Sequence, residues 1–270
     1  MPKAKVNGAT LWYTTMGEGE PILLHHGYTA CRDNWMPVAQ ILKNKYQVIL
    51  MECRGAGESE DTIDGYNLSQ YVKDVIGLAD HLDMEKFSFA GHSMGGGIAY
   101  LLGLNHPERL NKLILMAPIP SGGIKSMPSG HYFEQRMTAR KNGDREYFKS
   151  EMEASRFRPE VQTDAWFESR VDQLLRVSDA HIIDGMQTMF DLDVENKLST
   201  LNIPTLMIAG AVDSLITANL SDYQRLPNAS LHVFSRAGHD IAIHEPEGVS
   251  NVIDAFMEHG PMSADKLVAR

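Results

Sequence analysis

The sequence predicts an α/β fold, in which a mostly parallel sheet is flanked by helices and a helical cap is inserted before the last strands. Short apolar runs typical of buried strands alternate with segments whose apolar residues recur at helical spacing. This alternation stops between residues 121 and 192, where helical segments rich in Met and aromatic residues follow one another. We therefore expect a core of residues 1–120 and 193–270 and a cap, or lid, of residues 121–192.

The first elements come in a regular order. The stretch KVNGATLWYTTMGEG predicts an antiparallel hairpin, and the apolar runs at residues 22–25 and 47–51 predict buried strands. Residues 68–82 carry apolar side chains at helical spacing, which predicts a helix. Residues 87–89 predict a further short buried strand.

The strand pattern continues on both sides of the cap. A helix with apolar residues between 98 and 104 is expected after the strand at 87–89, and LNKLILMAPIP predicts a strand stopped by its prolines. After residue 192, IPTLMIAGAVD and ASLHVFSRAGHD predict two more strands. Residues 249–257 predict a closing amphipathic helix.

Composition and charge narrow the classes of partner. The chain has 270 residues and a formal net charge of -10, so we expect no nucleic acid partner, because that binding needs a basic surface. The first residues lack the apolar core of a secretory signal, and no segment is long enough to span a bilayer. We expect a soluble cytoplasmic protein whose substrate is a small molecule and which does not bind a membrane. The sequence does not indicate an oligomeric state.

A serine lies among glycines directly after the strand at residues 87–89. Gly91, Ser93 and Gly95 fit the G-x-S-x-G pattern of a nucleophile elbow, in which a strand ends in a strained turn and a helix leaves at once. Small neighbours are needed because the chain turns so tightly. The alternative is a glycine-rich strand-to-helix turn with an incidental serine, so the rest of the chain has to supply partners.

A serine hydroxyl needs a base, and the usual base is a histidine oriented by a carboxylate. His239 is the best candidate, because it follows the last predicted strand and a glycine that permits a tight loop. His244 and His232 have structural explanations at a helix start and inside a strand. His92 adjoins the nucleophile, and we expect its side chain to point away from the site.

The orienting acid should lie in a loop at the same edge of the sheet. Asp213 follows the preceding predicted strand, whereas the loop after Pro118 contains no carboxylate before Ser121. Asp240 adjoins the histidine, but neighbouring side chains diverge. The order Ser93, Asp213, His239 matches the chain order of a Ser, acid, His triad.

Acyl transfer also needs donors for an oxyanion. One is expected from the N–H of Met94, the residue after the nucleophile. The second is expected from the N–H of Tyr28, which follows His26 and Gly27 after an early strand. We interpret His26 itself as a residue that braces the loop.

Few residues of the cap can be assigned a role from sequence. Most of its Met and aromatic side chains should fill an irregular core, and some can line an adaptable apolar pocket. The candidates for substrate binding are Met137, Trp166, Met186 and Met189.

Five segments together resemble the α/β-hydrolase superfamily, and specifically its compact capped serine hydrolases of the esterase type. HHGYTACRDNW is similar to the oxyanion segment, ECRGAGES to a conserved turn, GHSMGG to the elbow, GAVD to the acid loop and GHDIAIHEPEGV to the histidine loop. The resemblance implies a cofactor-independent serine hydrolase. It would cleave carboxylic esters, thioesters or lactones of small to medium, largely apolar substrates through an acyl-enzyme.

The same triad supports other chemistry, so alternatives stay open. Ser93 at the elbow counts against haloalkane dehalogenases and epoxide hydrolases, which carry Asp there. Carbon-carbon bond hydrolases often have Trp directly after the histidine. This chain has Asp240 there, which disfavours carbon-carbon bond hydrolysis but does not exclude it. A further alternative is a ligand receptor on a hydrolase scaffold.

We expect neither a metal nor another cofactor. The histidines are scattered without ligand spacing. Cys31 and Cys53, the only cysteines, match no metal or disulfide framework. We interpret them as free buried thiols.

Overall fold

The computed structural model describes residues 2–125 and 130–262. Its centre is an eight-stranded sheet with the strand order β1-β2-β4-β3-β5-β6-β7-β8. β1 pairs with β2 and β2 with β4 in antiparallel fashion, and all other neighbouring strands are parallel. The mostly parallel sheet and the opening hairpin predicted from the sequence are therefore confirmed. Residue 1, and residues 126–129 and 263–270 of the expected cap and core, lie outside the described ranges.

The strands coincide closely with the predicted apolar runs. Their bounds are β1 Lys3–Val6, β2 Ala9–Met16, β3 Pro21–His25, β4 Gln47–Met51, β5 Phe87–His92, β6 Leu110–Met116, β7 Thr205–Gly210 and β8 Ala229–Phe234. Every residue of β5 and β7 is buried, as expected for parallel strands covered on both faces.

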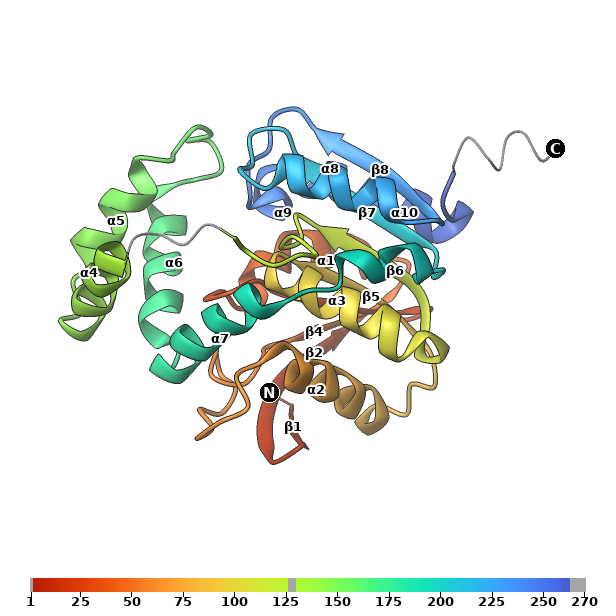
Figure 1. Ribbon diagram of the computed structural model, residues 1–270, viewed down its shortest axis with the longest axis horizontal. Helices are drawn as coiled ribbons and strands as arrows, with labels where there is room; N and C mark the ends of the chain where they lie inside the picture. The colour runs from red at the N-terminus through yellow and green to blue at the C-terminus, as the bar shows by residue number, and fades with distance from the viewer. Residues whose placement is uncertain (1, 126–129, 263–270) are drawn as a thin grey trace.

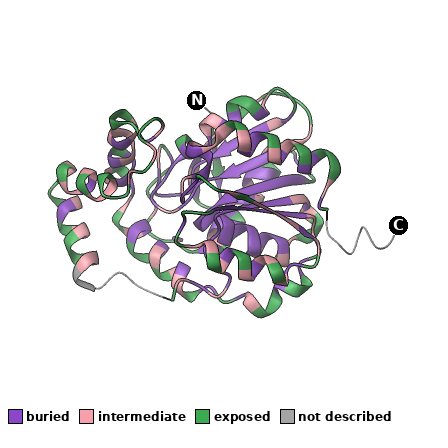
Figure 2. Cartoon of the chain, turned by 90° about the horizontal axis from the view of Figure 1, so that it is seen from above, coloured by how far each residue is buried: buried purple, intermediate pink, exposed green. Residues whose placement is uncertain are grey.

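Helices cover both faces of the sheet. Their bounds are α1 Met36–Leu42, α2 Leu68–His81, α3 Met94–Asn105, α4 Gly130–Lys141, α5 Arg145–Glu153, α6 Asp164–Arg176, α7 Asp179–Asp191, α8 Ile216–Arg225, α9 Ile241–His244 and α10 Pro246–His259. In Figure 2 the strands lie between helices whose outer faces are exposed.

Alternate residues of the central strands enter two separate cores. Leu23 and Ile49 pack with side chains of α2 and α3 on one face. Leu24 and Val48 pack with side chains of α1 and α10 on the other. Because successive side chains of a strand point to opposite faces, the central part of the sheet lies between two apolar layers.

The four helices α4 to α7 lie in the insertion, which we define as residues 121–192. Figure 1 shows α4, α5 and α6 grouped to one side of the sheet, whereas α7 runs back along the body of the molecule near α2 and α3. α5, α6 and α7 each begin at a side chain that caps the helix, namely Asp144, Thr163 and Ser178. A small apolar cluster around Phe148 and Val171 joins α4, α5 and α6.

Candidate active site

Ser93 occupies a strained turn between β5 and α3. Its φ of 56° and ψ of -114° lie outside the regions that an L-residue favours. The Ser93 N–H donates to the carbonyl of Met116 at the end of the neighbouring strand β6, and the Gly96 N–H donates to the Ser93 carbonyl within the turn. A Cβ added at Gly91 would overlap the backbone of Gly95. The glycines are therefore required by close packing of the strand end against the helix start.

The structure brings the three predicted partners together at the carboxyl ends of β5, β7 and β8. The Ser93 Oγ lies 2.9 Å from the His239 Nε2. The His239 Nδ1 lies 2.9 Å from the Asp213 Oδ2. The second oxygen of Asp213 accepts the Leu215 N–H at 3.1 Å, so both oxygens of the buried carboxylate are held.

Electrostatics match a base and its orienting acid. Burial by itself lowers the pKa of His239, but the hydrogen bond and the charge of Asp213 outweigh it and raise that pKa above the ordinary value. Burial would raise the pKa of Asp213, and the interaction with His239 reverses the effect and lowers it. Asp213 is therefore ionised at neutral pH and accepts the Nδ1–H, which leaves Nε2 free to accept the proton of Ser93.

The loop after β3 passes directly beside Ser93. A Cβ at Gly27 would come within 3.0 Å of the Ser93 Cβ. His26 braces this loop, as expected: its Nδ1 lies 2.8 Å from the Gly27 carbonyl oxygen, and its Nε2 accepts the Cys53 N–H at 3.1 Å. The backbone of Tyr28 follows at once. Met94 is the first residue of α3, where N–H groups have no partner within the helix.

The other candidates have different partners. The Asp240 Oδ1 accepts the Asn34 Nδ2–H at 3.2 Å, and the His244 Nδ1 accepts the Gly238 N–H at 3.3 Å. Our expectation for His92 was wrong, because its Nε2 lies 2.9 Å from the His239 carbonyl oxygen. The imidazole turns toward the loop of the base rather than away from it.

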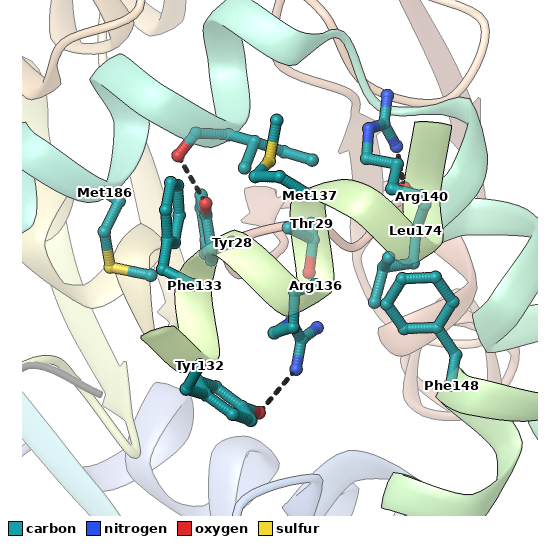
Figure 3. A pocket seen from close by; sticks show the side chains of 11 residues that line it. Tyr28, Thr29, Tyr132, Phe133, Arg136, Met137, Arg140, Phe148, Leu174 and Met186 are labelled. Atoms are coloured by element: carbon teal, nitrogen blue, oxygen red, sulfur yellow. Dashed lines mark hydrogen bonds between the residues drawn. The ribbon is translucent and has the colours of Figure 1, made fainter. Parts of the chain in front are cut away.

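Two cavities lie between the insertion and the core, and Thr29 belongs to the lining of both. The first has a volume of about 240 Å³ and is mostly apolar. Figure 3 shows Phe133, Met137 and Met186 around it, with the Tyr28 ring at its wall. The second, of about 280 Å³, is more polar, and its lining includes Arg170 and Asp240. Asp240 places this cavity next to the loop of His239.

The four candidate binding residues of the insertion lie in different places. Met137 and Met186 line the apolar cavity, and Trp166 lines the polar one. Met189 is only 2% exposed and packs in the main core, and neither cavity includes it in its lining. A flexible thioether suits both a core and a pocket, so the sequence could not separate these positions.

The comparison with known families settles the fold family. The sequence model of the family described as alpha/beta hydrolase fold matches residues 20–246. The chain belongs to the α/β-hydrolase family. Among its relatives is the dihydrolipoyllysine-residue acetyltransferase component of the acetoin cleaving system of Pseudomonas putida, which is 30% identical over 94% of this chain and 68% of that protein.

Other relatives of this α/β-hydrolase carry out different reactions. A 2-hydroxy-6-oxononadienedioate/2-hydroxy-6-oxononatrienedioate hydrolase of Paraburkholderia xenovorans is 28% identical over 92% of this chain and 91% of that protein. The solved structure of an enol-lactonase from Burkholderia xenovorans superposes with a TM-score of 0.84 at 20% identity, over 96% of this chain and 100% of that one. The family and a hydrolase fold are thus shown, and the relatives are named for different reactions.

The hydrolase site has basic side chains that the sequence analysis did not single out. Arg136 and Arg140 at the apolar cavity pair with Glu151 and Asp179. Arg170 at the polar cavity bonds only to the Thr29 carbonyl and the Gln173 Oε1, and no carboxylate of the described residues pairs with it. The sequence could not indicate that Arg170 lacks a carboxylate partner, because which arginine meets a carboxylate depends on how the neighbouring helices pack.

Two further findings concern the described residues of this hydrolase. No group of three or more His, Cys, Asp or Glu side chains among residues 2–125 and 130–262 is arranged to hold a metal ion. None of the helices in those ranges is long and apolar enough to cross a membrane. Cys31 and Cys53 are buried and free, as predicted.

Proposed function

We propose that this α/β-hydrolase is a serine hydrolase that cleaves carboxylic esters, thioesters or lactones of small to medium, largely apolar substrates. The observation that carries the proposal is the continuous hydrogen-bonded chain from Ser93 through His239 to Asp213, with both donor-acceptor distances at 2.9 Å. This is the arrangement that makes a serine hydroxyl nucleophilic at neutral pH.

Each residue has a distinct task. The His239 Nε2 accepts the proton of Ser93 as the Ser93 Oγ attacks the ester carbonyl, and Asp213 orients the imidazole and stabilises its positive charge. The N–H groups of Tyr28 and Met94 stabilise the tetrahedral oxyanion. The alcohol leaves with the proton from His239. Water, activated by the same imidazole, then releases the acyl group from Ser93.

The apolar cavity supports the proposed substrate class. Its lining by Phe133, Met137 and Met186 offers an apolar surface that can adapt to one flexible group. A volume of about 240 Å³ suits a short to medium acyl or alcohol chain. Ser93 and His239 are not among the residues that line this cavity, and Tyr28 is its link to the loop beside Ser93. The proposal therefore requires the ester group to extend past Tyr28 to reach the Ser93 Oγ.

The experiment is hydrolysis of p-nitrophenyl esters of increasing acyl length by the wild type beside Ser93→Ala. We expect turnover by the wild type and a loss of several orders of magnitude in the variant, with only a residual effect of the oxyanion donors. Near-normal turnover by Ser93→Ala would disprove the assignment. Absence of turnover by the wild type would favour the second candidate below, or a ligand receptor that retains the triad.

The second candidate is hydrolysis of a carbon-carbon bond in a substrate that carries a carboxylate. The observation that favours it is Arg170, a guanidinium at the wall of the polar cavity whose partners among the described residues are uncharged. Arginine suits the bidentate recognition of a carboxylate. The oxononadienedioate hydrolase relative acts, by its name, on a dicarboxylate. A vinylogous 1,5-diketone acid, assayed with wild type and Arg170→Gln, separates this candidate from the ester reaction.

A further inference from the structure

We propose that Tyr28 and His181 form a clamp that positions the Tyr28 N–H beside Ser93, so that the insertion controls the oxyanion site. The clamp is defined as the side chains of these two residues. The inference rests on the proposed function for the role of that N–H, and adds a positioning role for a side chain of the insertion.

The backbone and the side chain of Tyr28 contact different parts of the molecule. On the backbone side, Gly27 packs against the nucleophile, since a Cβ there would lie 3.0 Å from the Ser93 Cβ and 3.2 Å from the His92 Nδ1. On the side-chain side, the Tyr28 hydroxyl donates to the Ile182 carbonyl of α7 at 2.5 Å. Figure 3 shows this bond at the edge of the apolar cavity. Tyr28 therefore connects the nucleophile to α7.

His181 packs against the ring of Tyr28. Its ring stacks on the Tyr28 ring with centroids 5.6 Å apart and an interplanar angle of 17°. A Cβ at Gly185, one turn further along α7, would come within 3.4 Å of the Tyr28 ring. The phenol is thus enclosed by one helical turn of the insertion and has little freedom to rotate.

The core in turn holds His181. Its Nδ1 lies 2.8 Å from the Tyr71 hydroxyl of α2, and the Tyr66 ring contacts it edge-on. His181 is completely buried, and this burial lowers its pKa to about 3, so the imidazole is neutral. The His181 Nε2 has no hydrogen-bond partner in the described ranges. A buried nitrogen without a partner is a cost to folding.

The clamp has a consequence for catalysis. Oxyanion donors act only when they are held in place before the charge develops. Tyr28, whose side chain contacts α7, directly follows the Gly27 that packs against Ser93. Tyr28 also lines the apolar cavity. Loss of the clamp should therefore reduce stabilisation of the transition state, and binding of a short ester that does not fill the cavity should change little.

The principal variant is Tyr28→Phe, which removes the hydroxyl and keeps the ring. It should fold, because the Ile182 carbonyl lies inside α7 and keeps its helical hydrogen bond. His181→Phe is the second variant, and it keeps an aromatic ring against Tyr28. The matched control is Tyr66→Phe: Tyr66 also touches His181, but its hydroxyl donates to the Thr62 carbonyl outside the insertion.

Two measurements test the clamp. The first is kcat and KM for p-nitrophenyl acetate. The second is the affinity for a phenylboronic acid, which adds to the Ser93 Oγ and mimics the tetrahedral intermediate. We expect kcat and boronate affinity to fall together by about five- to twentyfold in Tyr28→Phe and His181→Phe, with KM within twofold and Tyr66→Phe close to wild type.

Several results would overturn the proposal. If Tyr28→Phe kept the kcat and the boronate affinity of the wild type, the Tyr28 hydroxyl would have no positioning role. If Tyr66→Phe lost as much kcat and boronate affinity as Tyr28→Phe, the effect would reflect general packing around His181 and not the clamp. Failure of the proposed function is distinguishable: a wild type that binds the boronate without hydrolysing esters refutes the ester reaction, and the boronate affinities of the variants then decide the clamp. A wild type that does neither refutes both.

Discussion

The His92 Nε2 lies 2.9 Å from the backbone carbonyl oxygen of His239, and the centroids of the two imidazole rings are 4.8 Å apart. Because a carbonyl can only accept, the His92 Nε2 carries the proton and donates it. Burial, followed by the nearby His239, lowers the pKa of His92 to about 4, so its ring is neutral at pH 7. The residue before the proposed nucleophile therefore holds the loop of the proposed base.

Replacement of His92 by Leu should lower kcat by about ten- to a hundredfold, because a small displacement of a catalytic group has effects of this size. The rate of p-nitrophenyl ester hydrolysis at pH 8 measures this loss of kcat. His232→Leu is the control, since His232 lies in β8 before the same loop and should leave kcat unchanged. Equal activity of both variants would show that His239 is positioned without His92.

The pH profile reports the interaction between Asp213 and His239. The protonated imidazole cannot accept the proton of Ser93, so kcat/KM should rise with pH through a pKa above the ordinary 6.5. Asp213→Asn removes the charge that raises this pKa. We expect the acid limb to move to lower pH, and kcat to fall by about three to four orders of magnitude.

Asp240→Asn is the matched control for that profile. Asp240 contributes less than Asp213 to the raised pKa of His239, and its carboxylate bonds to Asn34 rather than to the imidazole. The acid limb should shift slightly to lower pH and kcat should stay within a few-fold of the wild type. If the acid limb of the kcat/KM profile lay at the same pH in Asp213→Asn as in the wild type, the proposed role of Asp213 would be contradicted.

The apolar cavity should determine the preferred acyl length. Met186→Trp fills part of a space of about 240 Å³, so kcat/KM for octanoyl esters should fall at least tenfold while that for acetyl esters changes less than threefold. Met189→Leu is the control, because Met189 is buried in the core. A change of acyl preference in Met189→Leu but not in Met186→Trp would place the binding surface elsewhere.

A buried ion pair should contribute to folding without contributing to catalysis. The Arg54 guanidinium donates twice to Asp74, at 2.8 Å in both bonds, and both side chains are buried. Asp74→Asn leaves the arginine buried without its counter-charge, so the free energy of unfolding should fall by about 3–5 kcal/mol. Urea denaturation measures it.

The double variant Arg54→Met with Asp74→Leu separates charge from packing. Because it leaves no unpaired charge, we expect it to be more stable than Asp74→Asn. A double variant that is less stable than the single one would show that the hydrogen bonds of the pair outweigh its desolvation.

Local sequence was enough to place the strands and the elbow. The buried strands read as short apolar runs because both of their faces are covered, and β4 was predicted at the bounds it has. Ser93 was identifiable because its turn excludes side chains at Gly91 and Gly95. Steric requirements that act within a few residues leave a pattern of residue types, and this pattern can be recognised along the chain.

Long-range packing decided the features that sequence patterns could not. Met137 and Met189 have the same side chain, but one lines a cavity and the other the core. The hydrogen bond from Tyr28 to Ile182 joins residues 154 positions apart. Amino-acid type and spacing thus defined the elements and the candidate triad of this α/β-hydrolase. The direction of each side chain depended on how distant helices pack, because those contacts impose no periodicity on the sequence.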